Sequence, residues 1–131
     1  MKLLLDTHVI LWSAAEPERL PREVAQELED ESNEFWFSPI SAWEILLLVE
    51  KGRLAVEGDP EKAVRGLFQK LPLREAVLNQ EVAIQSRSVD LPHQDPVDRF
   101  LAATAMVYGL TLVTADSRLL NATEFSVLAI H

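Results

Sequence analysis

Four acidic residues are candidates for a site that binds a metal ion and uses it for catalysis. Asp6 directly follows the apolar run KLLL, Asp116 comes just past LTLVT, Glu44 is the one charge in AWEILLLV, and Asp98 lies in DPVDR before an alanine-rich stretch. Two of these acids also have a purely structural interpretation, because an aspartate behind a strand often caps the next helix or forms a turn. A catalytic interpretation therefore depends on whether the fold brings the four together.

Glu44 has two competing local explanations. Ser41 and Glu44 match the capping-box pattern, in which the acid reaches back to the serine backbone. Ser38 followed by Pro39 is the better helix start, with serine as the cap and proline at the first helical position. Glu44 then lies inside a helix that is apolar on nearly every face, and we expect that helix to be deeply packed. A carboxylate there costs several kcal/mol unless it is paired or metal-bound, which favours a functional role.

Asp95 and Asp98 also have a structural and a functional interpretation between them. Asp95 as cap, Pro96 at the first helical position and an acid at the third describe a regular helix start, so Asp95 is predicted to be structural. The small side chains of Ala102, Ala103 and Ala105 allow this helix to approach a sheet closely. We expect Asp95 to cap the helix and Asp98 to reach the site.

The elements that position these acids are short strands alternating with helices. Apolar runs at 2–6, 34–38, 71–75, 110–116 and 125–130 predict strands, and amphipathic or capped segments at 21–31, 41–52, 60–71, 79–90 and 96–109 predict helices. This alternation indicates one α/β domain over residues 1–131, a three-layer α/β/α arrangement around a mainly parallel sheet. Sites in such sheets gather at the carboxyl ends of the strands.

All four acids are expected at that edge, where carboxylates that share a pocket repel one another. A divalent cation relieves the repulsion, and hard oxygen ligands favour Mg²⁺ or Mn²⁺ over zinc. Such a pocket suits phosphodiester hydrolysis. Thr7 and Thr114 could hold metal-bound water or a ligand carboxylate, and Arg99 could steer phosphates, although each also fits an ordinary turn, strand or surface position.

Bulk composition narrows the function classes. The 131 residues include no cysteine, which excludes disulfides and thiolate chemistry, and 48% are hydrophobic, enough to bury a core. The net charge of −9 argues against a protein that coats nucleic acid and allows a basic partner. Lack of a long apolar span predicts a cytoplasmic protein without membrane contact.

Four segments in order, LLLDTHVILW, SPISAWEILLLVEKGRL, LPHQDPVDRFLAATA and LTLVTADSRL, resemble the PIN-domain ribonucleases, most of all the VapC-type toxins of type II toxin–antitoxin modules. The resemblance covers nearly the whole chain and implies a PIN fold. It implies that Asp6, Glu44, Asp98 and Asp116 bind Mg²⁺ or Mn²⁺ for endonucleolytic RNA cleavage, with Asp95 assisting. It also implies a homodimer and a cognate antitoxin with a basic tail. Residues 119–125 have no assignment.

Two alternatives remain from the sequence. A phospho-acceptor receiver domain is also a small parallel α/β protein with acids at one edge, but it normally has adjacent acids after the first strand, where this chain has Asp6 and Thr7. It also normally has a lysine after the last strand, and no lysine follows Asp116. The other alternative is a non-catalytic PIN-like binding module, against which the complete acidic set argues.

Overall fold

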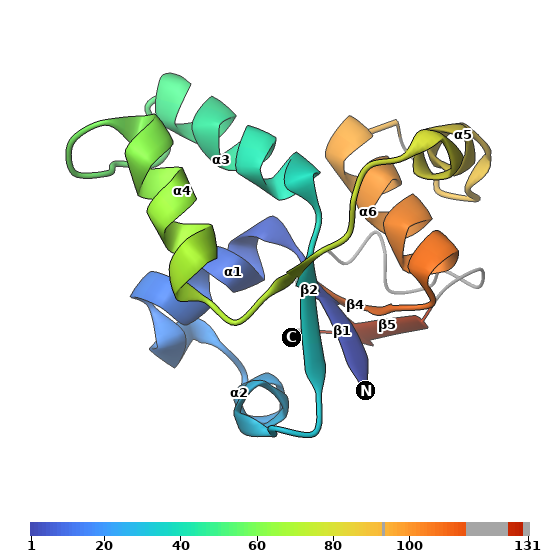
Figure 1. Cartoon of the computed structure of the whole chain (residues 1–131), viewed down its shortest axis with the longest axis horizontal. Helices are drawn as coiled ribbons and strands as arrows, with labels where there is room; N and C mark the ends of the chain where they lie inside the picture. Colours follow the sequence, from blue (N-terminus) through green and yellow to red (C-terminus); the bar gives the residue numbers. More distant parts are fainter. Residues whose placement is uncertain (93, 115–125, 130–131) are drawn as a thin grey trace.

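A parallel sheet forms the centre of the molecule (Figure 1). The computed structural model describes residues 1–92, 94–114 and 126–129. Within these residues the strands are β1 (Lys2–Leu5), β2 (Glu34–Phe37), β3 (Arg74–Glu75), β4 (Thr111–Thr114) and β5 (Ser126–Ala129). They pair in the order β3-β2-β1-β4-β5, and every pairing is parallel. Each of the five predicted apolar runs contains one of these strands.

This strand order bears on one of the alternatives. Receiver domains have the doubly wound order 2-1-3-4-5, whereas here β1 lies at the centre, between β2 and β4. The receiver interpretation is therefore wrong on topology as well as on motif.

Helices connect the strands. They are α1 (Thr7–Ala15), the short 3₁₀ helix η1 (Pro17–Arg19), α2 (Arg22–Glu29), α3 (Pro39–Glu50), α4 (Pro60–Lys70), α5 (Gln80–Ser88) and α6 (Pro96–Tyr108). Most start at a polar side chain that accepts a hydrogen bond from the first turn, and these caps are Asp6, Ser38, Asp59, Asn79 and Asp95. No helix in the described parts of the chain is long and apolar enough to cross a membrane.

The sheet has a core on each face because side chains alternate along its strands. Leu4 of β1 packs with Leu112 of β4 and Leu101 of α6, together with residues that follow α5. Leu3 and Leu5 point to the other face. There they pack with side chains of α1, α2 and α4, among them Val9, Ile10, Val24, Leu67 and Phe68. The two clusters confirm the three-layer arrangement, which Figure 1 shows with α6 on one side of the strands and α1 and α4 on the other.

Helix α3 joins the core at its first turn, where Ile40 packs against the cluster around Leu4. It contacts α1, α4 and α6, and in Figure 1 it lies above the sheet, at the end where β1 and β2 finish and α6 begins. Of its residues only Ser41 and Ile45 are buried, while Trp43 is 51% exposed and Glu44 is half-buried. The prediction of a deeply packed helix is therefore wrong, because the far side of α3 faces solvent and the leucines there are only half-buried.

Candidate active site

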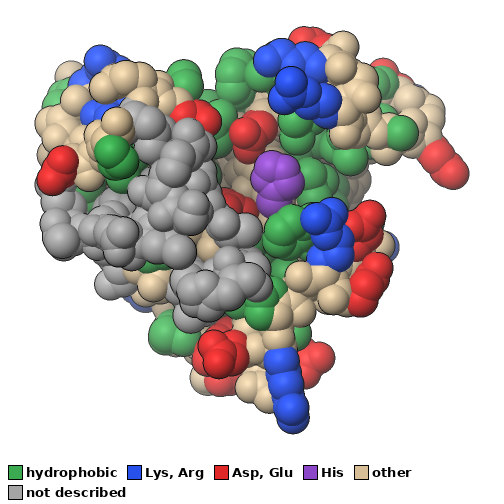
Figure 2. All heavy atoms as spheres, turned by 180° about the vertical axis from the view of Figure 1, so that it is seen from behind, with side chains coloured by type: hydrophobic (Ala, Val, Ile, Leu, Met, Phe, Trp, Pro, Cys, Tyr) green, Lys and Arg blue, Asp and Glu red, His purple; other side chains and the backbone are tan. Residues whose placement is uncertain are grey.

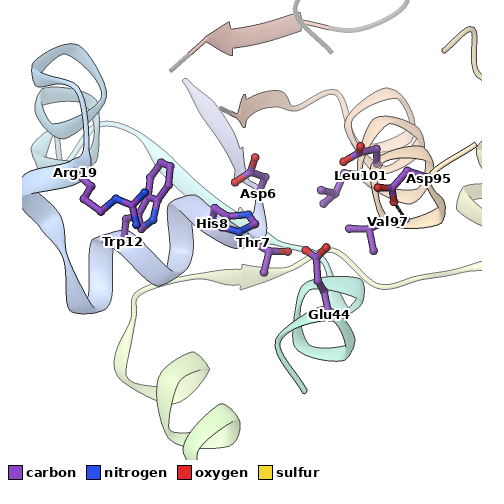
Figure 3. A pocket seen from close by; sticks show the side chains of 10 residues that line it. Asp6, Thr7, His8, Trp12, Arg19, Glu44, Asp95, Val97 and Leu101 are labelled. Carbon is purple, nitrogen blue, oxygen red and sulfur yellow. Dashed lines mark hydrogen bonds between the residues drawn. The ribbon is translucent and has the colours of Figure 1, made fainter. Parts of the chain in front are cut away.

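A cavity of about 450 Å³ opens where α1, α3 and α6 meet (Figure 3). It is lined by Asp6, Thr7, His8, Trp12, Arg19, Glu44, Asp95, Val97, Asp98 and Leu101. Figure 2, which shows the molecule from behind relative to Figure 1, has a histidine and acidic side chains beside a hollow in the surface. Three of the four acids predicted from the sequence therefore lie on one cavity, at the predicted edge of the sheet.

Asp6 is both a cap and a cavity residue. Its backbone N–H donates to the Val113 carbonyl (3.0 Å), so the pairing of β1 with β4 sets its position. Its Oδ1 accepts from the Val9 N–H (3.0 Å), which caps α1, and the residue is only 8% exposed. The structural and functional interpretations are compatible, because the cap holds the carboxylate rigidly at the cavity wall.

Asp95 and Asp98 take the places that the sequence predicts. Asp95 caps α6, its Oδ1 accepting from the Val97 N–H (3.0 Å), and Pro96 is the first helical residue. Asp98 follows in the first turn and is 9% exposed. The alanines of the following turns are buried against the sheet, which brings the start of α6 to the strand ends. Asp95 also lines the cavity, so its position allows a role in the site in addition to capping α6.

Asparagine at position 95 separates these two roles. Asp95→Asn should leave the free energy of unfolding within about 0.5 kcal/mol of the parent, whereas Asp95→Ala should cost about 1 kcal/mol, because asparagine caps helices nearly as well as aspartate. Urea unfolding of both variants measures this difference. If Asp95→Asn folds normally but loses most of the RNA cleavage that the resemblance to PIN-domain ribonucleases implies, its charge acts in the site and a purely structural role is wrong.

Glu44 reaches the cavity from inside α3, and Figure 3 shows its side chain pointing from that helix into the cavity. The helix starts at Ser38, whose Oγ accepts from the Ile40 N–H (3.1 Å), so the Ser41–Glu44 capping box does not form. Ser41 instead accepts a hydrogen bond from the Thr7 hydroxyl (3.0 Å). Because Glu44 is half-buried and borders open space, the large desolvation cost expected for it is not present.

The two threonines differ. Thr7 is 1% exposed and lines the cavity, and its bond to Ser41 ties the start of α1 to α3. Thr114 is fully buried at the end of β4. Thr7 thus has a defined task, which is to hold two walls of the cavity together.

Arg99 does not face the cavity, which overturns its proposed phosphate-steering role. The side chain is 5% exposed and lies between α6 and α5. Its Nε donates to the Ser86 carbonyl (2.8 Å), and its Nη2 donates to the carbonyls of Arg87 (3.1 Å) and Val89 (2.9 Å). These are the carbonyls at the end of α5, which a guanidinium satisfies well. Arg99 is therefore a structural link between two helices.

The described residues supply only part of a metal site. Asp116, the fourth predicted acid, lies outside the described residues. Among those that are described, no three histidine, aspartate or glutamate side chains form a ready-made metal-binding cluster. The donors that line the cavity are carboxylate oxygens, which are the ligands that Mg²⁺ and Mn²⁺ prefer.

Sequence reasoning missed two side chains that line the cavity, Arg19 and Trp12. Arg19 was not among the basic residues considered, yet it lines the cavity, with its guanidinium carbon 4.5 Å from the ring centroid of Trp12. Trp12 was not assigned to the site either; it is half-buried, packs against the cluster around Leu3 and Leu5, and also lines the cavity. An arginine seven residues after a tryptophan, across the end of a short helix, was the available signal. This signal is weak, because the spacing brings Arg19 back over Trp12 only if the chain turns as it does at η1, and the sequence did not predict that turn.

Known proteins match this chain over nearly its full length. The PIN domain family model matches residues 3–125. Ribonuclease VapC22 of Mycobacterium tuberculosis is 33% identical over 120 residues, which are 89% of this chain and 88% of that protein. Two solved structures share the fold: VapBC2 from Rickettsia felis bound to a DNA fragment from its promoter (TM-score 0.72, 15% identity) and DNA-bound VapBC from Salmonella typhimurium (TM-score 0.68, 18% identity). Each alignment covers 98% of both chains. The chain belongs to the PIN-domain family.

Proposed function

We propose that this protein is a metal-dependent endoribonuclease and the toxin of a type II toxin–antitoxin pair. The observation that carries the proposal is the single cavity shared by Asp6, Glu44 and Asp98, which come from three distant parts of the chain. Similarity to Ribonuclease VapC22 supports RNA as the substrate, and the VapBC complexes among the structural relatives support an antitoxin partner. A non-catalytic PIN-like module would have no need of this arrangement.

Asp6, Glu44, Asp98 and Asp116 are the residues we assign to a Mg²⁺ or Mn²⁺ site. A bound cation would activate a water and stabilise the charge that develops on the phosphate. The chain itself contributes placement. The β1–β4 pairing and the α1 cap hold Asp6, the first turn of α6 holds Asp98 against the sheet, and α3 presents Glu44 from the opposite wall. Rigid carboxylates of this kind keep ligand geometry while the substrate binds.

Removing divalent ions should abolish RNA cleavage, and adding Mg²⁺ or Mn²⁺ back should restore it, because carboxylates alone repel the phosphate backbone. The measurement is cleavage of total RNA, with the new ends mapped by sequencing, in excess EDTA and after metal is restored. Circular dichroism in EDTA serves as the control for folding. Cleavage that continues undiminished in EDTA would contradict the proposal.

The partner we propose is an antitoxin whose basic tail enters the acidic cavity. Four carboxylate residues line that cavity, and the net charge of the chain is −9. A second, mostly apolar cavity of about 330 Å³ lies between α3 and α4, lined by residues such as Phe37, Leu46 and Phe68. An amphipathic segment with a basic end would match both features. We further propose a homodimer, which native mass spectrometry of the purified chain would detect.

A further inference from the structure

The wall of the active-site cavity opposite α6 differs in chemistry from the rest. Figure 3 shows Arg19 and Trp12 at one end of the view and Asp95 at the other, with Asp6 and His8 between them. The Arg19 guanidinium lies over the Trp12 indole at 4.5 Å, and its Nη1 donates to Glu16 Oε2 at 3.1 Å. Arg19 is thus held over an aromatic face at the mouth of the cavity.

Arg19 differs in charge from the acidic residues that line the rest of the cavity. Among the described residues that line the cavity, Arg19 is the single lysine or arginine, against four carboxylates. A phosphate at the acidic end would need a metal ion to offset repulsion, whereas a neighbouring phosphate near Arg19 would meet a cation of the chain itself. A guanidinium presents several donors in a plane and can bind a phosphate through two of them at once. Stacking on Trp12 reduces the freedom that it would lose on binding.

Aromatic surface lies next to this cation. The rings of His8 and Trp12 have centroids 6.0 Å apart and are tilted by 54°, and both residues line the cavity. His8 is exposed, while Trp12 is half-buried. Aromatic and guanidinium faces stack with unpaired bases, and a base inside a duplex cannot offer its face in this way. The surface therefore favours unpaired RNA.

We propose that His8, Trp12 and Arg19 form a nucleotide subsite beside the cleavage centre. Arg19 binds the phosphate next to the scissile one, and the two rings contact the unpaired base attached to it. This assignment rests on the proposed ribonuclease function and goes beyond it by naming the residues that bind an unpaired nucleotide beside the cleaved bond. The three residues bind and position RNA and take no part in the bond-breaking step.

Binding to short RNAs tests the subsite without relying on cleavage. Fluorescence anisotropy is measured with a fluorescein-labelled single-stranded 12-mer and with its duplex, using the full chain in an Asp98→Asn background and Mn²⁺. Arg19→Ala should weaken binding of the single strand about 10-fold and of the duplex less than about 2-fold. Trp12→Leu should also weaken single-strand binding several-fold, and Trp12→Phe, which keeps an aromatic face, should restore most of it.

Two control variants separate this subsite from general charge effects. Arg22→Ala removes the same charge from an exposed position at the start of α2, outside the cavity lining, and should change binding little. Glu16→Gln removes the carboxylate that competes with RNA for the Arg19 guanidinium, and it should tighten single-strand binding in the parent chain but not in the Arg19→Ala variant. In the chain with Asp98 intact, Arg19→Ala should raise KM more than it lowers kcat.

The outcomes distinguish the subsite from the proposed function. If Arg19→Ala behaves like Arg22→Ala, or weakens single-strand and duplex binding equally, the subsite is wrong even if RNA is cleaved. If the parent chain cuts no RNA but single-strand binding still depends on Arg19 and Trp12, the subsite stands and the nuclease proposal fails. Thermal melting of each variant verifies that a loss of binding is not a loss of fold.

Discussion

Asp98→Asn is expected to lower metal-dependent RNA cleavage by more than about 100-fold, since loss of a metal ligand should exceed the 10- to 100-fold cost of losing a group that only supports one. The fold should remain, because asparagine has nearly the same shape and keeps one oxygen acceptor in the first turn of α6. Removing a negative charge from a cavity with other carboxylates also lowers their mutual repulsion. The measurement is the initial rate of RNA cleavage in saturating Mn²⁺, with urea unfolding of the same preparation.

Asp6→Asn should behave in the same way, since asparagine at position 6 still caps α1. Glu23→Gln is the matched control, because Glu23 is also an acid in the first turn of a helix but is exposed and outside the cavity lining. It should retain full cleavage. Turnover close to that of the parent in both the Asp6 and the Asp98 variants would overturn the assigned site.

Arg99→Met is expected to destabilise the protein by about 3 kcal/mol, because each buried carbonyl left without its donor costs about 1–3 kcal/mol. Methionine fills similar space but leaves the carbonyls of Ser86, Arg87 and Val89 without their donors. A domain is stable by only about 5–15 kcal/mol, so the loss is a large fraction of the total. Arg99→Lys should recover little, because a single ammonium cannot reproduce the planar set of donors.

Urea unfolding followed by circular dichroism measures this loss, and the melting temperature should fall by about 10 °C or more. Arg87→Met is the control, because Arg87 is exposed on the same pair of helices and its backbone carbonyl is untouched. A variant at position 99 with normal stability and greatly reduced RNA binding would contradict the structural role. It would support the earlier prediction that Arg99 steers phosphates.

Most of the fold follows from local signals in the sequence. Runs such as KLLL and TLVT predict buried parallel strands, and the caps at Ser38, Asn79 and Asp95 mark helix starts that the structure confirms. Strand order could not be predicted in this way, because pairing of β1 with β4 depends on contacts between residues far apart in the chain. The burial of α3 was overestimated for the same reason, since the apolar sequence of a helix does not show how many other elements cover it.

The candidate site divides along similar lines. Asp6 and Asp98 were found because a strand end and a helix start place them at one edge of a sheet. Arg99 was misassigned because adjacency in sequence to Asp98 does not mean adjacency in space. Successive residues of a helix point about 100° apart, and here that turns Arg99 toward α5 while Asp98 faces the cavity.

The central place of β1 has a consequence for biosynthesis. Translation makes β1 long before its neighbour β4, and a parallel sheet cannot close until these distant segments meet. A nascent chain that holds Asp6 and Glu44 but lacks α6 and β4 has neither the far wall of the cavity nor the strand that fixes Asp6. We therefore expect nuclease activity to emerge abruptly once α6 and β4 have been made, so that products interrupted before them are inactive.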